Sequence, residues 1–324
     1  MTFLVYFFAV LKNVIYGLSV FFTGELSASV DVLDILALRF LMSFVVMWLL
    51  KALKIIKVNI GIGDFVRKNE RTSAIKYILL ASLFEPVLYM LFETWGVSLT
   101  TGITAGVILS LNPVTGCIAE EIFLKEKSTF LQKILLGIGI VGVIYIAANS
   151  SSADGKDTLA GILLVLMAVI TGSLFLTFSR KCSKDFNAME RTYVASMLGM
   201  IVFNLVNVIR HLYAGDITSY FNPYFDSGNL MGFIFLGVVC AVIATGMNNF
   251  ALGKMQVSTM SAFSGLSTLV TIAVGVIFGG EKLYTFHIIG LSLIVIRMVG
   301  VSYIQIKRDK KAGDVKKVQT AKRQ

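Results

Sequence analysis

Long apolar stretches alternate with short polar segments along the whole chain. A helix rises about 1.5 Å per residue, so roughly 20 apolar residues are enough to cross the hydrocarbon core of a bilayer. Ten stretches of the chain meet this length. The pattern therefore predicts an all-α polytopic membrane protein with ten transmembrane helices, at residues 3–23, 32–53, 77–98, 101–124, 131–148, 158–179, 192–212, 231–252, 257–278 and 286–305.

One stretch of sequence occurs twice. Residues 89–127 end in Ile-Phe-Leu-Lys-Glu-Lys, and residues 246–282 end in Ile-Phe-Gly-Gly-Glu-Lys, 155 positions later. In the same register Thr104 falls on Thr259. We interpret the chain as a duplicated unit of about half its length, because similarity at a fixed spacing is the mark of a repeat.

Five predicted helices fall in each copy. Because five is an odd number, the second copy enters the membrane from the opposite side, so the two five-helix repeats are expected to be inverted. Inverted repeats are a recurring plan of secondary transporters, whose substrate site lies near the midplane between the halves. The expected organisation is a first repeat at 1–148, an extracytoplasmic linker at 149–157, a second repeat at 158–305 and a basic cytoplasmic tail at 306–324.

Composition agrees with a protein whose solvent is the lipid bilayer. The 324 residues are 56% hydrophobic and 15% charged, with a mean hydropathy of +0.81, which is more apolar surface than a soluble domain buries. The first apolar stretch follows no basic segment and precedes no small-residue cleavage site. We therefore expect it to be a retained anchor and not a removed signal.

The net charge of +10 raises the question of a nucleic-acid partner. If the N-terminus is cytoplasmic, 23 of the 29 Lys and Arg residues fall in the cytoplasmic segments and the tail. This asymmetry is the positive-inside signature. It predicts that both termini lie in the cytoplasm of a protein of the cell membrane, and it explains the charge without nucleic acid.

Charged and amide side chains inside the predicted helices are the candidate functional groups. Charge at such depth costs several kcal/mol, about 3 on insertion scales, so these groups are expected to face the bundle interior. A structural ion pair and a substrate site both remain open for them. The substrate-binding or coupling candidates are Lys12, Asn13, Arg39, Glu85, Tyr89, Glu93, Trp95, Asn112, Asn248, Asn249 and Arg297.

Glu85, Tyr89 and Glu93 lie four residues apart, and thus on one helix face. Glu93 lies at about the same predicted depth as Arg39, so the two are expected to pair or to meet a charged substrate. Glu85 adjoins the helix-breaking Pro86 and is the candidate for proton coupling. If Lys12 holds Glu85 ionised, the pair is instead structural.

The chain resembles the EamA-type members of the drug/metabolite transporter superfamily over nearly its whole length. The resemblance rests on the five-plus-five spans, on Arg39-Phe40, on the run from Pro113 to Glu126, and on the matching Glu281. It implies export or exchange of small polar metabolites, such as amino acids, through a cavity lined by both halves. The chain departs from the pattern at Thr268, where a second proline would be expected.

Glu126 and Glu281 each lie where one predicted helix ends and the next begins. A carboxylate at such a place can accept hydrogen bonds from exposed backbone N–H groups at a helix start. We therefore expect both to be architectural and not substrate ligands.

The alternatives are a polytopic membrane enzyme and a passive channel. No metalloprotease, nucleophile-elbow or phosphate-loop motif occurs, and the three cysteines have no metal-binding spacing, so neither a catalytic residue, a metal nor a cofactor is predicted. The polar residues also lack the repeated rings of a selectivity filter. The sequence favours a transporter of a small-molecule substrate, and it leaves open a homodimer.

Overall fold

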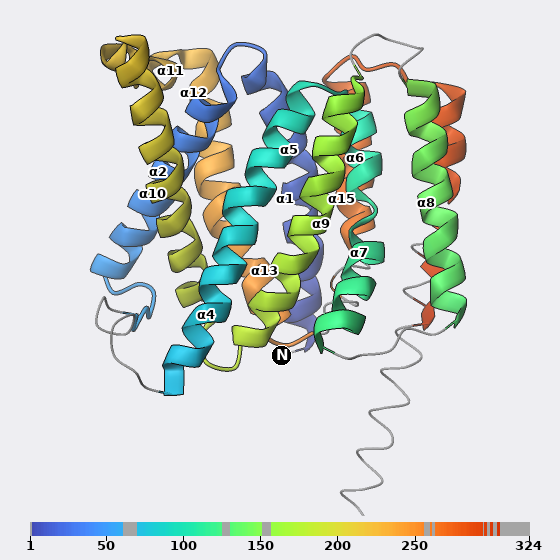
Figure 1. The fold of residues 1–324 in the computed structure, drawn as a ribbon, viewed down its shortest axis with the longest axis horizontal. Coiled ribbons are helices and arrows are strands. Elements are labelled where there is room, and N and C mark those ends of the chain that lie inside the picture. The colour runs from blue at the N-terminus through green and yellow to red at the C-terminus, as the bar shows by residue number, and fades with distance from the viewer. Residues whose placement is uncertain are drawn as a thin grey trace, which may run out of the picture.

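The computed structural model describes residues 2–60, 70–124, 130–150, 157–255, 260, 263–293, 295–296, 299–300 and 303–304. Regular structure within these residues is helical, with no strand among them. The helices stand side by side in one bundle, with the N-terminus at one end and the short helices α11 (Asn222–Phe225) and α12 (Ser227–Ile234) at the other (Figure 1). We call these the N-terminal end and the linker end.

The first half of the chain forms two long helices and then several shorter ones. Breaks divide the middle of this half into consecutive pieces. The elements are α1 (Thr2–Ser27), α2 (Val32–Ala52), α4 (Glu70–Ser82), the π-helix η1 (Leu83–Leu88), α5 (Tyr89–Ser98), α6 (Gly102–Leu109), α7 (Asn112–Ala119), the π-helix η2 (Glu120–Leu124) and α8 (Phe130–Ser150).

The second half begins with two long uninterrupted helices and ends in shorter pieces. Beyond α11 and α12 its elements are α9 (Leu159–Cys182), α10 (Ala188–Ala214), the 3₁₀-helix η3 (Ile217–Ser219), the π-helix η4 (Phe235–Ala244), α13 (Thr245–Leu252) and α15 (Ser264–Ile277).

Seven helical segments among the described residues are long and apolar enough to cross a membrane. They are Leu4–Ser27, Val32–Ala52, Ile75–Ser98, Gly102–Phe123, Leu159–Cys182, Ala188–Ala214 and Ser227–Leu252. Large apolar side chains such as Trp48, Leu205 and Phe130 are exposed on the outside of the bundle, as a lipid-facing surface requires. The chain is therefore a multi-pass membrane protein, as its apolar pattern predicted.

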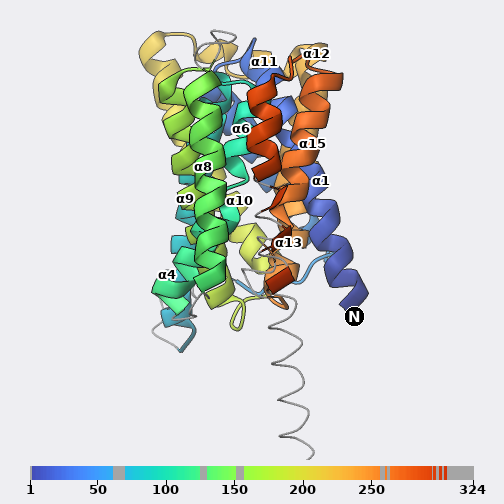
Figure 2. The same ribbon diagram turned by 90° about the vertical axis from the view of Figure 1, so that its right-hand side faces the viewer.

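Helices from the two halves pack against one another throughout the bundle. Extensive contacts join α2 to α10, α1 to α15, and α5 to α9. Figure 2 shows the helices standing roughly parallel, with α8 on the side that faces the viewer. Because each half buries its apolar faces against the other, the interior of the bundle is built from both.

The ends of α10 show how local sequence sets a helix boundary. The Asn187 Oδ1 atom accepts from the Glu190 N–H at 2.9 Å, and Glu190 Oε2 accepts from the Asn187 N–H at 2.9 Å. These reciprocal bonds form a capping box. At the other end Gly215 adopts a left-handed φ of 73°, which a glycine takes without steric cost.

Two interruptions divide the helices of the first half near mid-membrane. Glu85 has a non-helical φ of −141° and ψ of 118°, immediately before Pro86, which has no N–H to continue the helix. The second break separates α6 from α7 at Ser110 and Leu111, just before Asn112-Pro113. Both predicted proline irregularities are therefore found, and both lie beside interior polar residues.

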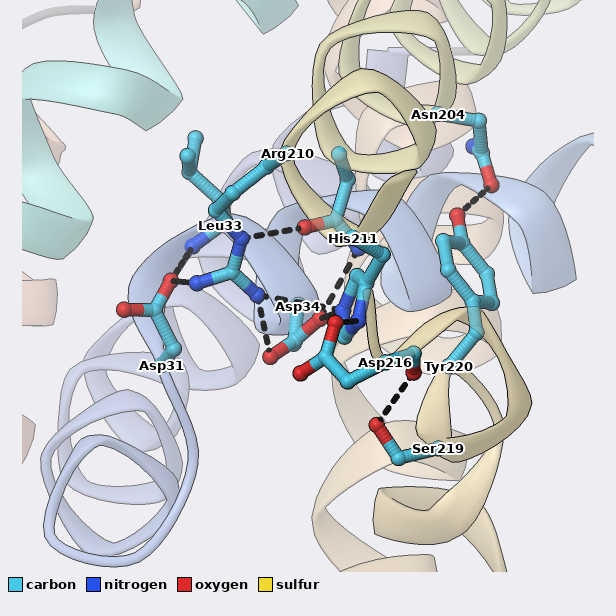
Figure 3. Close-up of polar contacts among 10 residues, drawn as sticks. Asp31, Leu33, Asp34, Asn204, Arg210, His211, Asp216, Ser219 and Tyr220 are labelled. Carbon is cyan, nitrogen blue, oxygen red and sulfur yellow. Dashed lines mark hydrogen bonds and ion pairs between the residues drawn. The ribbon is translucent and has the colours of Figure 1, made fainter. Parts of the chain in front are cut away.

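A polar cluster at the linker end fastens the start of α2 to the end of α10 (Figure 3). Asp34 is its centre, because its carboxylate accepts from Arg210 Nη2 at 2.7 Å and from Asn207 Nδ2 at 2.8 Å, and lies 2.8 Å from His211 Nε2. The other ring nitrogen of His211 lies 2.8 Å from Asp216 Oδ1. The cluster thus satisfies a largely buried carboxylate from three sides.

Two tyrosines fasten the loop that follows α10 to the bundle. Tyr220 is buried, and its hydroxyl donates to Asn204 Oδ1 at 2.6 Å. Burial raises the pKa of the Tyr220 phenol above its ordinary value of 10.0, so the hydroxyl stays a donor. Tyr224 likewise donates to the backbone oxygen of Leu38, while Phe225 is exposed.

Replacing Asp34 with alanine is expected to lower the free energy of unfolding by about 3 kcal/mol, because it leaves buried donors without an acceptor. The exposed Asp185 is the matched control, and its alanine variant should change stability by less than about 0.5 kcal/mol. Reversible unfolding in detergent measures both. Equal effects of the two substitutions would show that the cluster does not hold α2 to α10.

Candidate functional site

A polar cavity of about 80 Å³ lies inside the bundle, between the two halves of the chain. Its wall is built by α1, η1, α5, α6, α7, α9, η4, α13 and α15. The lining side chains are Lys12, Asn13, Tyr16, Ser19, Val20, Glu85, Tyr89, Met90, Glu93, Gly106, Leu109, Asn112, Gly172, Leu176, Cys240, Asn248, Met260, Ser264, Ser267, Thr268 and Thr271. We call this space the central cavity.

Lys12 and Asn13 enter the central cavity from α1. The Asn13 side chain donates its Nδ2 hydrogen to the backbone oxygen of Ala9 at 2.6 Å, so the amide is tied to its own helix. The Lys12 ammonium lies 5.3 Å from the centre of the Tyr16 ring, a cation–π distance. Lys12 is buried and forms no ion pair with any described residue, although the charge of Glu85 is close enough to act on it.

Glu85, Tyr89 and Glu93 line the central cavity together, as their spacing predicted. The Tyr89 hydroxyl donates to Glu93 Oε1 at 3.4 Å, a long hydrogen bond. Neither carboxylate forms an ion pair with a described residue. The three side chains thus reach one cavity although the helix is interrupted at Glu85.

Arg39 and Glu93 form no ion pair, so the direct pair, the first of the two arrangements expected from the sequence, is not found. Its Nη2 atom donates to the Cys240 sulfur at 3.5 Å, and its guanidinium carbon lies 5.7 Å from the centre of the Phe40 ring. Arg39 lines a pocket of about 20 Å³ beside the central cavity, not the cavity itself. Arg39 and Glu93 were predicted at similar depth in the membrane, but their side chains line different spaces.

The remaining predicted residues divide between the cavity and other places. Asn112 and Asn248 line the central cavity, and Asn248 Oδ1 is buried with no hydrogen-bond partner. Asn249, one residue further, points elsewhere and bonds to Ser179 and Thr192.

Two further candidates do not contribute to the cavity that the structure describes. Trp95 is 36% exposed and does not line the central cavity, because it lies two positions beyond Glu93 and so on the opposite helix face. Arg297 lies outside the described residues.

A buried arginine, Arg191, joins two helices at the N-terminal end of the bundle. Arg191 Nη1 donates to the backbone oxygen of Ser179 at 3.1 Å and to its Oγ atom at 2.9 Å. Its Nη2 atom donates to the backbone oxygen of Asn249. One side chain of α10 therefore holds the last turns of α9 and α13 together, below the central cavity.

A vestibule of about 540 Å³ lies at the linker end, lined by Glu25, Asp157, Glu281, Lys282 and His287 among others. Val20 and Thr271 line both this vestibule and the central cavity, so they form the layer between the two spaces. The central cavity thus adjoins the vestibule through this layer.

Two carboxylates hold the start of α6 at the floor of the vestibule. Glu281 accepts from the Gly102 N–H at 2.8 Å and from the Ile103 N–H at 2.9 Å, which confirms its predicted architectural role. Asp157, which sequence reasoning missed, accepts from the Thr101 N–H at 2.6 Å and from the Thr104 hydroxyl at 2.7 Å. Glu126 lies outside the described residues.

Threonines of α15 form a tight seam with α1 and α6 at the layer between cavity and vestibule. The Thr271 hydroxyl donates to the backbone oxygen of Gly17 at 3.0 Å, and the Thr268 hydroxyl donates to that of Gly106 at 3.1 Å. Threonine at position 268, in place of the expected proline, thus makes a bond between the halves. A Cβ atom on Gly17 would lie 2.6 Å from the Ser267 oxygen, so only glycine permits this contact.

Comparison with known proteins gives a consistent result. The model of the EamA-like transporter family matches the chain twice, at residues 3–148 and 159–303. The uncharacterized transporter YcxC of Bacillus subtilis (strain 168) is 29% identical over 308 residues, which cover 95% of this chain and 96% of YcxC. An uncharacterized transporter of Archaeoglobus fulgidus is 26% identical over 235 residues, covering 71% and 78% of the two chains.

The fold is also found among solved structures. One crystal structure is similar to this chain with a TM-score of 0.64 and 14% sequence identity, over 93% of this chain and 97% of that one. The likeness extends over both halves, and at this level of identity it shows a shared fold.

Replacing Gly17 with alanine is expected to lower the free energy of unfolding by about 1–3 kcal/mol, because the added methyl group forces α15 away from α1. Gly137 in α8 is the matched control, since a Cβ there meets nothing within 4 Å. Its alanine variant should be neutral or slightly more stable. Thermal unfolding in detergent compares them, and a harmless Gly17→Ala would contradict the tight seam.

Proposed function

This chain belongs to the EamA-like transporter family, and we propose that it is a secondary transporter that moves a small polar metabolite across the cell membrane by alternating access. The observation that carries the proposal is the central cavity: a space between the two halves, lined by Lys12, Glu85 and Glu93 without ion pairs among them. An unpaired charged group inside a membrane carries a free-energy cost, and such groups commonly mark the path or binding site of a solute.

We propose ten transmembrane helices arranged as two inverted five-helix repeats. The two family matches have nearly equal length, which supports the duplication. Opposite starting points support the inversion: α1 begins at the N-terminal end, whereas α9 begins at the linker end (Figure 1), just after Thr158, whose N–H donates to the Leu99 oxygen. Two inverted halves offer two conformations of similar energy, one open to each side.

Both termini and the basic tail at 306–324 are proposed to lie in the cytoplasm, and the linker at 149–157 outside. The charge asymmetry of the sequence supports this orientation. In this orientation the vestibule faces outward, and the Arg191 bonds lie on the cytoplasmic side.

A zwitterionic or otherwise polar solute fits the central cavity better than a purely lipophilic one. Lys12 offers a cation, Glu85 and Glu93 offer anions, and Asn248 Oδ1 offers a buried acceptor without a partner. An amino acid or a related compound carries the complementary groups. The direction is proposed as efflux or exchange. The names of the relatives favour a transporter over an enzyme.

Proton coupling is proposed to run through Glu85. Its carboxylate lines the central cavity at the break in the helix, and Lys12 does not form an ion pair with it. A carboxylate in such a place can bind and release a proton in each cycle. The lipid bilayer is the surrounding partner, a homodimer remains a prediction, and no nucleic acid is required.

Proteoliposomes with an imposed pH gradient test this function, using a panel of amino acids, nucleosides and vitamins. Wild-type protein should accumulate a substrate against its gradient. Glu85→Gln should keep exchange of that substrate but lose gradient-driven accumulation by roughly tenfold or more, because the variant cannot release a proton. Glu121→Gln, which does not line the central cavity, is the control and should transport as wild type does.

If the rate of transport does not depend on the pH gradient, proton coupling is wrong, but the proposal of exchange still stands. A Glu85→Gln protein that still concentrates substrate would assign coupling to another group. If no member of the panel is transported, the substrate class is wrong.

A further inference from the structure

Among the residues that the structure describes, Arg39 is the most deeply buried charged side chain, and two of its three guanidinium nitrogens have no hydrogen-bond partner. The side chain is 1% exposed, and both Nε and Nη1 lack any hydrogen-bond partner. Its single bond, from Nη2, goes to the Cys240 sulfur, a weak acceptor. Burying an arginine whose Nε and Nη1 atoms have no hydrogen-bond acceptor destabilises the folded state. Packing of the protein alone therefore gives no reason for an arginine at this position.

Arg191 shows what a structural arginine looks like in the same bundle. It is about as buried, at 5% exposed, yet both of its terminal nitrogens donate to oxygen atoms of Ser179 and Asn249, and only Nε lacks an acceptor. The bundle therefore can supply oxygen acceptors to a buried guanidinium. At Arg39 it supplies none.

The space beside Arg39 connects it to the central cavity. Arg39 lines a pocket of about 20 Å³, and Tyr16, Glu85, Met90 and Cys240 line both that pocket and the central cavity. The volume is about that of one water molecule or one ligand oxygen. A solute in the central cavity is thus separated from the guanidinium only by side chains that both spaces share.

The charged side chains around Arg39 suit a solute that carries both a negative and a positive group. Glu85 and Glu93 are near enough for their charges to act on Arg39, but neither contacts it. We propose that Arg39 binds one carboxylate oxygen of the transported solute through one of its free nitrogen atoms, Nε or Nη1, while Glu85 and Glu93 face the solute's cationic group. A hydrogen bond from a guanidinium to a carboxylate oxygen is shorter and stronger than one between neutral groups. This inference rests on the proposed function and names its substrate class.

The test compares each common L-amino acid with its own carboxamide, which lacks the carboxylate charge. Purified wild-type protein, Arg39→Gln, Arg39→Lys and Arg191→Gln are heated in detergent with each compound, since a ligand of the native state raises Tm. At least one acid should bind wild type about tenfold to a hundredfold more tightly than its amide. Arg39→Gln should lose this preference and Arg39→Lys should keep part of it.

The variants also separate recognition from stability. Arg39→Gln without ligand should be at least as stable as wild type, because it removes an unsatisfied buried charge. Arg191→Gln should lower Tm yet keep the acid preference. An Arg39→Gln protein that fails to fold, a preference that survives Arg39→Gln, or a wild type that no acid stabilises more than its amide would each overturn the assignment.

Transport of the same compounds is measured separately in proteoliposomes. Acid-selective binding without transport would retain the Arg39 subsite and remove the proposed function. Transport without acid selectivity would retain the function and remove the subsite.

Discussion

The cost of keeping charge inside an apolar bundle governs this structure. At its two ends the charges are satisfied: Arg191 by backbone and hydroxyl oxygens, and Asp34 by three donors. In the middle, Lys12 and Arg39 lie near carboxylates without touching them. The charged groups that lack an ion-pair partner therefore lie at the centre of the bundle, where a bound solute would supply one.

The backbone follows the same division between ends and middle. Capped, uninterrupted helices such as α2, α9 and α10 form the frame, while the helices around the central cavity are broken at Glu85 and between α6 and α7. The carboxylates of Asp157 and Glu281 hold one end of the broken segment. A helix divided in this way can move in one half while the other stays packed, which is the kind of motion that alternating access requires.

Much of this arrangement could be predicted from sequence, because the bilayer imposes strong rules. Apolar length predicted the seven spanning segments found among the described residues. The four-residue spacing predicted that Glu85, Tyr89 and Glu93 line one cavity, and the position of Glu281 at a helix junction predicted its role. Each of these follows from one helix considered alone or from its end.

The errors share one cause, which is that depth along a helix does not define direction around it. Arg39 and Glu93 lie at similar depth but do not meet. Asn248 and Asn249 are neighbours in sequence, but successive residues of a helix point about 100° apart. Asn248 therefore lines the central cavity, whereas Asn249 bonds to Ser179. Asp157 and Arg191 had no signal in the sequence, because their partners come from distant segments.

The central claim is that one cavity serves both sides of the membrane in turn. Ser267 lines that cavity. After replacement of the native cysteines, a Ser267→Cys variant in sealed vesicles of known orientation can be labelled with an impermeant thiol reagent from either side. Labelling from each side, in vesicles that stay tight to small ions, is the predicted result. Labelling from one side only, or an ion leak that accompanies labelling, would contradict alternating access.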